Sequence, residues 1–429
     1  MASVEQREKI RVITDEIARR LEEQWPEGEA HINQIEDLAK KVSEELGREV
    51  TREIIAEQSG RRKGNQIACS CGGRAFYRGQ YRQTWVTGHG RIVAQRAYFY
   101  CGKCGQGHCP IDGEWGIGIA NTTPTVQAMV SAFAAEDPYT KVMRLLGRAG
   151  APIHLGTKSV ELIAQALGQA VAAKPPRLTA KAERALAVAV DGTIMLTRGR
   201  GKEVRCGVIY EPDWEAGRTP EAERGLRKEY FGTTEQSRDS LIRTVCAQVE
   251  RRRPTPDTKV SALGDGAPWI WQGYAKHLPN RVEILDFYHV VEHLGVVAAA
   301  WHGEGSQQAG RWIAEMKGAL KGGGPDGLLR SLRAWRPKTA SAGKVKAREL
   351  EYFRKNRQRM NYHVYLAQGL PIGSGAVEGA CKNLVGARFK GSGMRWNQAT
   401  AEPLLQLRAA LLSRPDLDLR AYVSTHMPA

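Results

Sequence analysis

The chain has 429 residues, 42% of them hydrophobic and 25% charged, which is too long for one compact core and normal in composition for a globular protein. Its 63 Lys and Arg residues against 46 Asp and Glu residues give a net charge of +17, which favours a polyanionic partner and above all nucleic acid. An anionic membrane is the rival partner, but no run approaches the roughly 18 apolar residues of a membrane span, so we expect no membrane association. The first residues are charged throughout, which predicts a cytoplasmic protein without a secretory signal, whose eight cysteines are thiols or metal ligands rather than disulfides.

Residues 1–65 are expected to form a helical segment. Apolar residues recur every three or four positions in 10–21 and again in 35–46, and Gly47 follows the second stretch before a further helix. Two helices joined at a glycine are compatible with a helix-turn-helix, and a helical packing or dimerisation arm fits the same pattern.

Residues 66–117 are expected to form a zinc-ribbon-like β domain. Apolar and polar residues alternate there, which predicts short antiparallel strands with a hairpin at 87–90. Two cysteine pairs flank these strands, as a tetrahedral thiolate zinc site requires. The expected zinc ligands are Cys69, Cys71, Cys101 and Cys104. The first pair is a CxC, one residue shorter than the usual CxxC, so His108 or Cys109 could replace one ligand, and a set of free thiols is the alternative to a zinc site.

The rest of the chain predicts a multidomain α/β protein. Residues 118–176 are expected to be a helical DNA-binding domain with a second possible helix-turn-helix and a linker at its end. Residues 177–290 are expected to give three strands, a helix, two strands and a helix, followed by a helical stretch over 291–370 and a last segment over 371–429. The scattered cysteines are expected to be ordinary core residues: Cys206, Cys246 and Cys381.

Three acidic residues stand out by their position at the ends of core elements. Asp191 follows an apolar strand, Asp265 lies between two glycines after another strand, and Glu378 falls in the first turn of a helix. Ser374 is expected to cap that helix. Such carboxylates can converge on Mg²⁺, and two ions about 4 Å apart can activate a water against a phosphodiester. Each also has an ordinary interpretation: an Asp-Gly turn, a loop aspartate satisfied by backbone N–H groups, and a helix-terminus charge paired with Lys382.

A fourth feature is the stretch ILDFYHVVEH, which places Asp286 and His289 three residues apart at the end of a strand. An Asp-x-x-His pair can hold a metal, contact a phosphate or form a structural hydrogen bond. His293 lies one turn after His289 and shares its helical face.

Taken together, four motifs in order resemble a known family. The stretches VAVDGT, ALGDGAPWI, ILDFYHVVEHL and GLPIGSGAVEGACKNLVGARFKGSGMRW span about 190–400 and resemble bacterial insertion-sequence transposases of the DDE class. More narrowly, they resemble the RNase H-like branch that includes Mutator-type and hAT-type enzymes. That branch has an Asp-Asp-Glu triad, a Cys/Asp-x-x-His signature just after the second Asp, and a helical insertion before the Glu.

The resemblance implies a site and a reaction. The triad would be Asp191, Asp265 and Glu378, holding two Mg²⁺ or Mn²⁺ ions, and Asp286 and His289 would be the signature. A rival assignment puts Asp286 in the triad in place of Asp265. The fold implied is an RNase H-like core over 177–290 and 371–429, interrupted by the helical insertion 291–370, and one structural Zn²⁺ is expected in the ribbon. The reaction implied is cleavage at transposon ends and attack of the freed 3′-OH on target DNA.

The expected partner is double-stranded DNA, both transposon ends and target, bound by a homodimer or larger assembly associated with the nucleoid. The residues expected to contact DNA are Lys382, Arg388, Lys390, Arg395 and Trp396. The four cations would contact phosphates, whereas Trp396 would stack on a flipped base or simply pack. Two alternatives stay open: an RNase H-like nuclease without transposition, and a non-catalytic, domesticated DNA-binding regulator.

Overall fold

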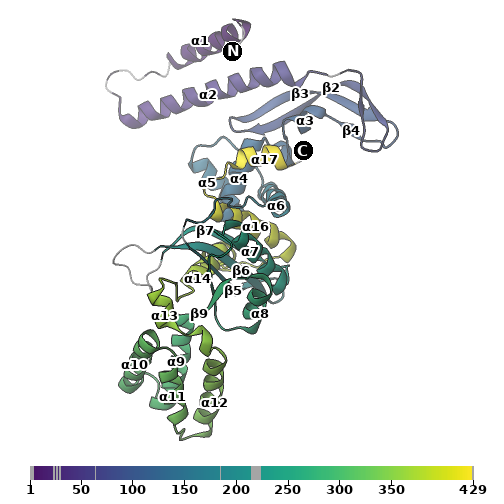
Figure 1. Ribbon diagram of the computed structural model, residues 1–429. Coiled ribbons are helices and arrows are strands. Elements are labelled where there is room, and N and C mark those ends of the chain that lie inside the picture. Colours follow the sequence, from purple (N-terminus) through teal and green to yellow (C-terminus); the bar gives the residue numbers. More distant parts are fainter. Residues whose placement is uncertain are drawn as a thin grey trace. The chain divides into compact units, whose positions relative to one another are not determined.

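The computed structural model describes residues 4–22, 25, 28, 30–62, 64–183, 185–213 and 224–427. The chain is a mixed α/β protein with two sheets (Figure 1). It divides into two compact units, Met1–Ala170 with Leu417–Ala429, and Val171–Asp416. The C-terminal residues 417–429 therefore group with the N-terminal part, whereas the sequence assigned them to the same segment as Glu378. Within the described residues, no helix combines the length and the apolar character needed to cross a bilayer.

The first unit contains one antiparallel sheet and a set of helices. The sheet runs in the order β1 (Gln66–Ala68), β2 (Arg74–Thr87), β3 (Gly90–Cys101) and β4 (Gly107–His108). Its helices are α1 (Val4–Glu22), α2 (Ile32–Ser59), α3 (Pro110–Glu114), η1 (Ile119–Asn121), α4 (Pro124–Glu136), α5 (Tyr139–Arg148), α6 (Thr157–Ala173) and α17 (Leu419–His426). The hairpin predicted at 87–90 is confirmed, because Thr87 pairs with Gly90 across a two-residue turn. Helix α17, which the sequence did not predict, packs on α4.

Gly47 does not separate two helices. Helix α2 is continuous from Ile32 to Ser59, so the break expected at Gly47 is wrong, and of the two alternatives a helix-turn-helix joined at Gly47 is excluded. The reason for the glycine is a close approach: a Cβ at Gly47 would lie 2.6 Å from the His89 ring in the β2–β3 turn. A glycine in a helix costs about 1 kcal/mol, which tertiary packing overrides here.

The second unit is built on a five-stranded sheet in the order β7-β6-β5-β8-β9. Its strands are β5 (Leu186–Leu196), β6 (Gly201–Asp213), β7 (Arg224–Thr233), β8 (Val260–Gly264) and β9 (Arg281–Leu285). Strands β5, β6 and β7 pair antiparallel, whereas β8 and β9 run parallel to β5. The buried run Leu186–Val190 and the fully buried β8 form the centre of the core.

The helices of this unit surround the sheet and extend it. Helix α7 (Arg238–Arg252) packs on β6, and α16 (Gln398–Ser413) packs on β7. Helix α8 (Pro268–His277) joins β8 to β9, where the sequence suggested only a glycine-rich turn; two parallel strands need such a crossover. The segment after β9 folds into α9 (Phe287–His302), α10 (Gln307–Gly323), α11 (Asp326–Ala334), α12 (Ala340–Lys355), η3 (Arg357–Arg359) and α13 (Tyr362–Ala367). These helices gather beside the sheet as a separate helical bundle (Figure 1).

The bundle has its own aromatic core. The Trp301 ring stacks on Trp335 at 5.1 Å and lies 5.7 Å from Trp312. The chain then returns to the sheet through α14 (Gly375–Ala380), a π-helical stretch η4 (Cys381–Gly386) and α15 (Ala387–Phe389).

Candidate functional site

The cysteines of the β1–β4 sheet come together as a metal-ligand group. Among the residues that the structure describes, Cys69, Cys71, Cys101 and Cys104 are the one set of three or more His, Cys, Asp or Glu side chains whose ligand atoms all lie within 4.8 Å. The Sγ atoms of Cys69 and Cys104 are 3.6 Å apart, and those of Cys71 and Cys101 are 3.7 Å apart. A tetrahedral zinc with Zn–S bonds of about 2.3 Å needs sulfur–sulfur distances near ~3.8 Å. The four thiols can therefore hold a structural zinc ion.

The short CxC spacing is accommodated by the backbone. Gly72 N–H donates to the Cys69 carbonyl at 3.0 Å, and Gly105 N–H donates to the Cys101 carbonyl at 2.9 Å, so both pairs end in a closed turn. Both glycines have positive φ, +76° for Gly72 and +71° for Gly105. This conformation costs glycine nothing and most other residues about 1–2 kcal/mol.

The two substitute ligands considered from the sequence differ in position. His108 Nε2 lies 3.3 Å from Cys69 Sγ, at the border of the cluster. Cys109 lies outside the four-sulfur group at the N-cap of α3, and burial raises the pKa of its thiol. Within the group, the N–H of Cys104 is the main cause that lowers the pKa of the Cys101 thiol to about 7. The Gln106 N–H lowers the pKa of the Cys104 thiol, but burial and the three other sulfurs raise it to about 12.

Asp191 lies inside a strand rather than at its end. Strand β5 continues to Leu196, and Asp191 and Gly192 pair with Cys206 and Arg205 of β6. The plain Asp-Gly turn is therefore wrong. The end of the strand was mispredicted because the apolar run ends at Val190. The pairing of β5 with β8 ends at Ala189, whereas its antiparallel pairing with β6 continues to Leu196.

Three aspartates occupy equivalent register positions, one within β5 and two directly after the neighbouring parallel strands β8 and β9. Leu263 of β8 pairs with Ala189 of β5 on one side and with Ile284 of β9 on the other. Two residues after each of these lie, in turn, Asp265, Asp191 and Asp286. We call these three residues the aspartate row. It lies at the carboxyl ends of β8 and β9, the edge of a parallel sheet where ligands bind.

The pKa of Asp191 reflects its burial and its two acidic neighbours in the row. Burial raises the pKa of Asp191, and the charges of Asp265 and Asp286 raise it further. The Gly192 N–H, which donates to Asp191 Oδ1 at 2.6 Å, and the nearby His289 lower it. A carboxylate disfavoured by burial and by like charges is stabilised by a cation.

The other two aspartates are held by different contacts. Asp265 Oδ1 accepts a hydrogen bond from Ala267 N–H at 2.8 Å. Asp286 caps α9 by accepting from Tyr288 N–H at 2.9 Å, and its second oxygen accepts from the Ser374 hydroxyl. Ser374 therefore makes no side-chain cap for the helix of Glu378, although it occupies the N-cap position. Since both oxygens of Asp286 are engaged, it is the more structural member of the row.

His289 and the helical bundle border the row. His289 Nδ1 lies 3.1 Å from Glu292 Oε2, and its ring is 4.9 Å from that of His293. His293 in turn stacks on Tyr352 at 3.9 Å and bonds to the buried Glu349 at 2.5 Å. Nothing in the sequence pattern pointed to Tyr352, because it lies in α12, far along the chain from the aspartates.

Glu378 is in the first turn of α14, as expected, but it does not join the row. Its side chain is 66% exposed and pairs with Lys382 at 2.6 Å, which is the ordinary interpretation considered above. Among the described residues, no group of three carboxylates is arranged to hold a metal ion. Helix α14 nevertheless packs against β5 and β6. Cys381 follows Glu378 by three residues and contacts Cys206, which pairs with Asp191 across the two strands. Cys381 and burial raise the pKa of the Cys206 thiol well above its ordinary value.

The residues expected to contact DNA fall into two groups. Arg388 is 1% exposed and its guanidinium lies 4.9 Å from the centre of the Trp396 ring, so it belongs to the core and is not placed to reach a phosphate. Trp396 is 9% exposed and donates to the Phe389 carbonyl at 3.1 Å, so it packs rather than stacks on a base. Lys382, Lys390 and Arg395 are exposed. Lys390 Nζ donates to Thr193 Oγ1 at 2.6 Å, two residues beyond Asp191.

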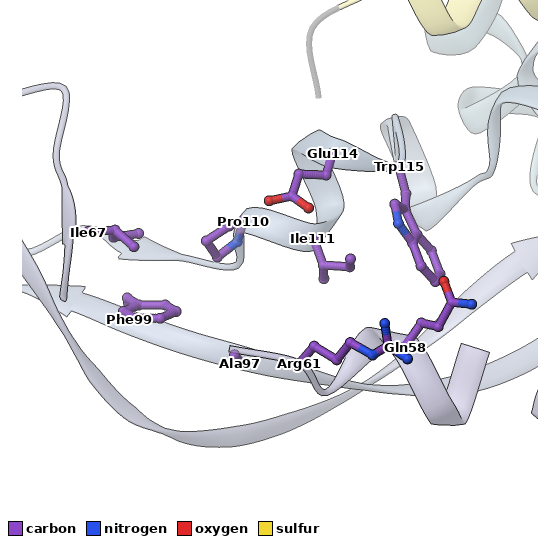
Figure 2. A pocket seen from close by; sticks show the side chains of 9 residues that line it. All are labelled: Gln58, Arg61, Ile67, Ala97, Phe99, Pro110, Ile111, Glu114 and Trp115. Atoms are coloured by element: carbon purple, nitrogen blue, oxygen red, sulfur yellow. The ribbon is translucent and has the colours of Figure 1, made fainter. Parts of the chain in front are cut away.

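A separate pocket lies in the first unit. It has a volume of about 320 Å³ and lies between the end of α2, β3 and α3 (Figure 2). Phe99, Ile111 and Trp115 give it apolar walls, and Arg61 and Glu114 carry opposite charges at its border. It contains none of the residues expected to be functional.

No protein-family model matches the chain, and no curated protein matches its sequence.

Proposed function

We propose that this protein is a DDE-type DNA transposase with an RNase H-like core, which cleaves DNA at transposon ends and joins the freed 3′-OH to target DNA with divalent metal ions. The observation that carries the proposal is the aspartate row: Asp191 within β5, and Asp265 and Asp286 at the equivalent positions directly after β8 and β9. The sheet supports the implied RNase H-like core, because three antiparallel strands are followed by two parallel ones. The helical bundle before α14 supports the implied helical insertion.

The donor set suits Mg²⁺. This ion usually binds through one or two carboxylates and completes its shell with water and substrate phosphates. Asp191 and Asp265 would hold it, since Asp286 is engaged by Tyr288 and Ser374. The chemistry supplied there is activation of a water or 3′-OH and stabilisation of the leaving oxygen of a phosphodiester.

The protein side chains orient this site. Asp286 fixes the start of α9 and so the position of His289. Lys390, held against Thr193 beside the row, supplies a positive charge for a DNA phosphate. Glu378 would reach the row only after leaving Lys382, so its catalytic role requires a change of side-chain conformation when DNA and metal bind. In the first unit, the four-cysteine group supports a zinc-ribbon-like domain that reads the transposon ends.

The test is cleavage and strand transfer with Mg²⁺ or Mn²⁺ on the DNA that flanks the gene. We expect activity in the native chain and its loss in Asp191→Asn, Asp265→Asn and Glu378→Gln with DNA binding kept. Asp239→Asn is the matched control, because Asp239 is an exposed carboxylate of the same unit that pairs with Lys276 and His277. Cleavage without strand transfer would instead indicate the nuclease.

One observation favours the second candidate, a DNA-binding regulator without catalysis. Glu378 is exposed and ion-paired, as a helix-terminus charge would be. If the native chain binds DNA and does not cut it under any metal, and Glu378→Gln binds equally, this candidate replaces the transposase.

A further inference from the structure

The β2–β3 hairpin exposes large aromatic side chains. Phe76 is 49% exposed, Tyr81 is 51% exposed and Tyr100 is 37% exposed. Single exposed apolar residues are ordinary, but a contiguous group on one face marks an interaction surface. Figure 1 shows β2 and β3 as a long twisted ribbon, and helices α2 and α3 pack on β3.

These rings share one face of the ribbon. Phe76 lies directly opposite Tyr100 in the antiparallel register. Tyr98 is two residues before Tyr100 and therefore points to the same side. The Tyr81 ring lies 4.3 Å from the Tyr98 ring, which adds it to the same group. We call Phe76, Tyr81, Tyr98 and Tyr100 the aromatic face.

The stretch of chain that forms the ribbon is rich in positive charge, and Asp112 of α3 pairs with Arg96 beside it. The sequence has no Asp or Glu between Glu57 and Asp112. The same stretch carries nine basic residues: Arg61, Arg62, Lys63, Arg74, Arg78, Arg82, Arg91, Arg96 and Lys103. Arg74, Arg78 and Arg82 are exposed on β2 itself. Arg74 lies two residues before Phe76 and therefore points to the same side as the aromatic face.

We propose that the aromatic face binds single-stranded nucleic acid, with unpaired bases stacked on Phe76, Tyr81, Tyr98 and Tyr100 and a phosphate on Arg74, which shares that face. Aromatic rings stack on the faces of bases, and those faces are accessible only where a strand is unpaired. An acidic partner without bases would use the arginines but would gain nothing from the rings. The inference rests on the proposed DNA partner and specifies that the DNA is bound as a single strand at the aromatic face. It does not depend on the aspartate row.

The experiment measures binding of the full-length, zinc-loaded chain to a fluorescent oligonucleotide of about 20 nucleotides, single-stranded or as a duplex, without Mg²⁺. We expect tighter binding of the single strand. Phe76→Ala and Tyr100→Ala should each weaken it by at least about fivefold, while duplex binding changes little. Val93→Ala is the matched control, because Val93 is equally exposed on β3, at 49%, but has no ring.

Two further variants separate stacking from loss of structure. Phe76→Leu and Tyr100→Leu keep an apolar side chain and remove the ring, so they should weaken binding about as much as the alanine changes if stacking is the cause. Zinc content and circular dichroism check the fold. Equal binding by the native chain and all four ring variants would overturn the inference, as would weakening of duplex binding to the same extent. Asp191→Asn should bind the single strand as the native chain does, so failure of catalysis and failure of this surface are distinguishable.

Discussion

The hydroxyl of Tyr352 donates a hydrogen bond of 2.9 Å to the backbone carbonyl of Asp265. Tyr352 lies in α12 of the helical bundle, so this bond ties the bundle to the turn that carries the central aspartate of the row. Gly266 makes the approach possible: its φ is +101°, and a Cβ there would lie 2.9 Å from the Tyr352 ring. Burial raises the pKa of Tyr352, and Asp265 and Asp286 raise it further, so the hydroxyl keeps its proton as a donor.

Removing that hydroxyl should slow catalysis more than it affects folding. We expect Tyr352→Phe to reduce the rate of metal-dependent cleavage by about tenfold, a loss of about 1.4 kcal/mol, because the Asp265 turn is no longer held. Tyr365→Phe is the matched control, since its hydroxyl also donates to backbone carbonyls, those of Gln358 and Glu283, away from the row. Single-turnover cleavage and urea denaturation measure the two effects, and equal loss of rate in both variants would contradict a specific role for Tyr352.

The cysteine group should bind one structural metal. We expect about one zinc per chain by elemental analysis, lost in Cys101→Ser and kept in Cys109→Ser, because Cys109 lies outside the four sulfurs. A chelator should lower the melting temperature of the native chain and leave that of Cys101→Ser unchanged. Retention of full zinc by Cys101→Ser would mean that another residue, such as His108 beside Cys69, completes the site.

Asp191 should make stability depend on pH. Burial and its acidic neighbours raise its pKa above the ordinary 3.8, so its ionised form is disfavoured in the folded state. The folded chain therefore loses stability as the pH rises from 3.8 through the raised pKa, and regains none above it. We expect Asp191→Asn to raise the melting temperature at neutral pH in metal-free buffer, with no gain in acid, and Mg²⁺ to stabilise only the native chain.

The control for this prediction is Asp239, whose pKa is shifted in the opposite direction from that of Asp191. Hydrogen bonds from His277 and Lys276 lower the pKa of Asp239. Its contribution to stability is present at neutral pH and is lost as the pH falls, so Asp239→Asn should lower the melting temperature at neutral pH and have little effect in acid. Identical pH profiles for the two variants would show that Asp191 is not in the environment described above.

Local patterns predicted most elements but not the relations between them. Alternation and apolar runs identified the β2–β3 hairpin and the strands β5, β8 and β9, because each reflects burial along one segment. The break expected at Gly47 was wrong because its cause, the His89 ring, is a tertiary contact. The equivalence of Asp191, Asp265 and Asp286 depends on the register between strands, which no single segment encodes.

The candidate site shows the same limit at the level of side chains. The aspartates were predicted as residues, but Tyr352 could not be, because its contact with Asp265 joins distant segments. The sequence also did not predict which basic side chains are buried. Arg388 and Lys390 are two residues apart in one basic stretch, and only Lys390 is exposed. On a helix, a difference of two residues turns a side chain to another face.

The difference in burial between Arg388 and Lys390 predicts that substituting them has different effects on stability and on DNA binding. Arg388→Ala should lower the free energy of unfolding by about 2 kcal/mol or more, because it empties a buried site against the Trp396 ring. Lys390→Ala should change stability by no more than about 0.5 kcal/mol, yet weaken DNA binding and reduce the slope of log affinity against log salt by about 1. Urea denaturation and salt-dependent binding measure both variants. A stable Arg388→Ala that no longer binds DNA would show that the guanidinium reaches a phosphate after all.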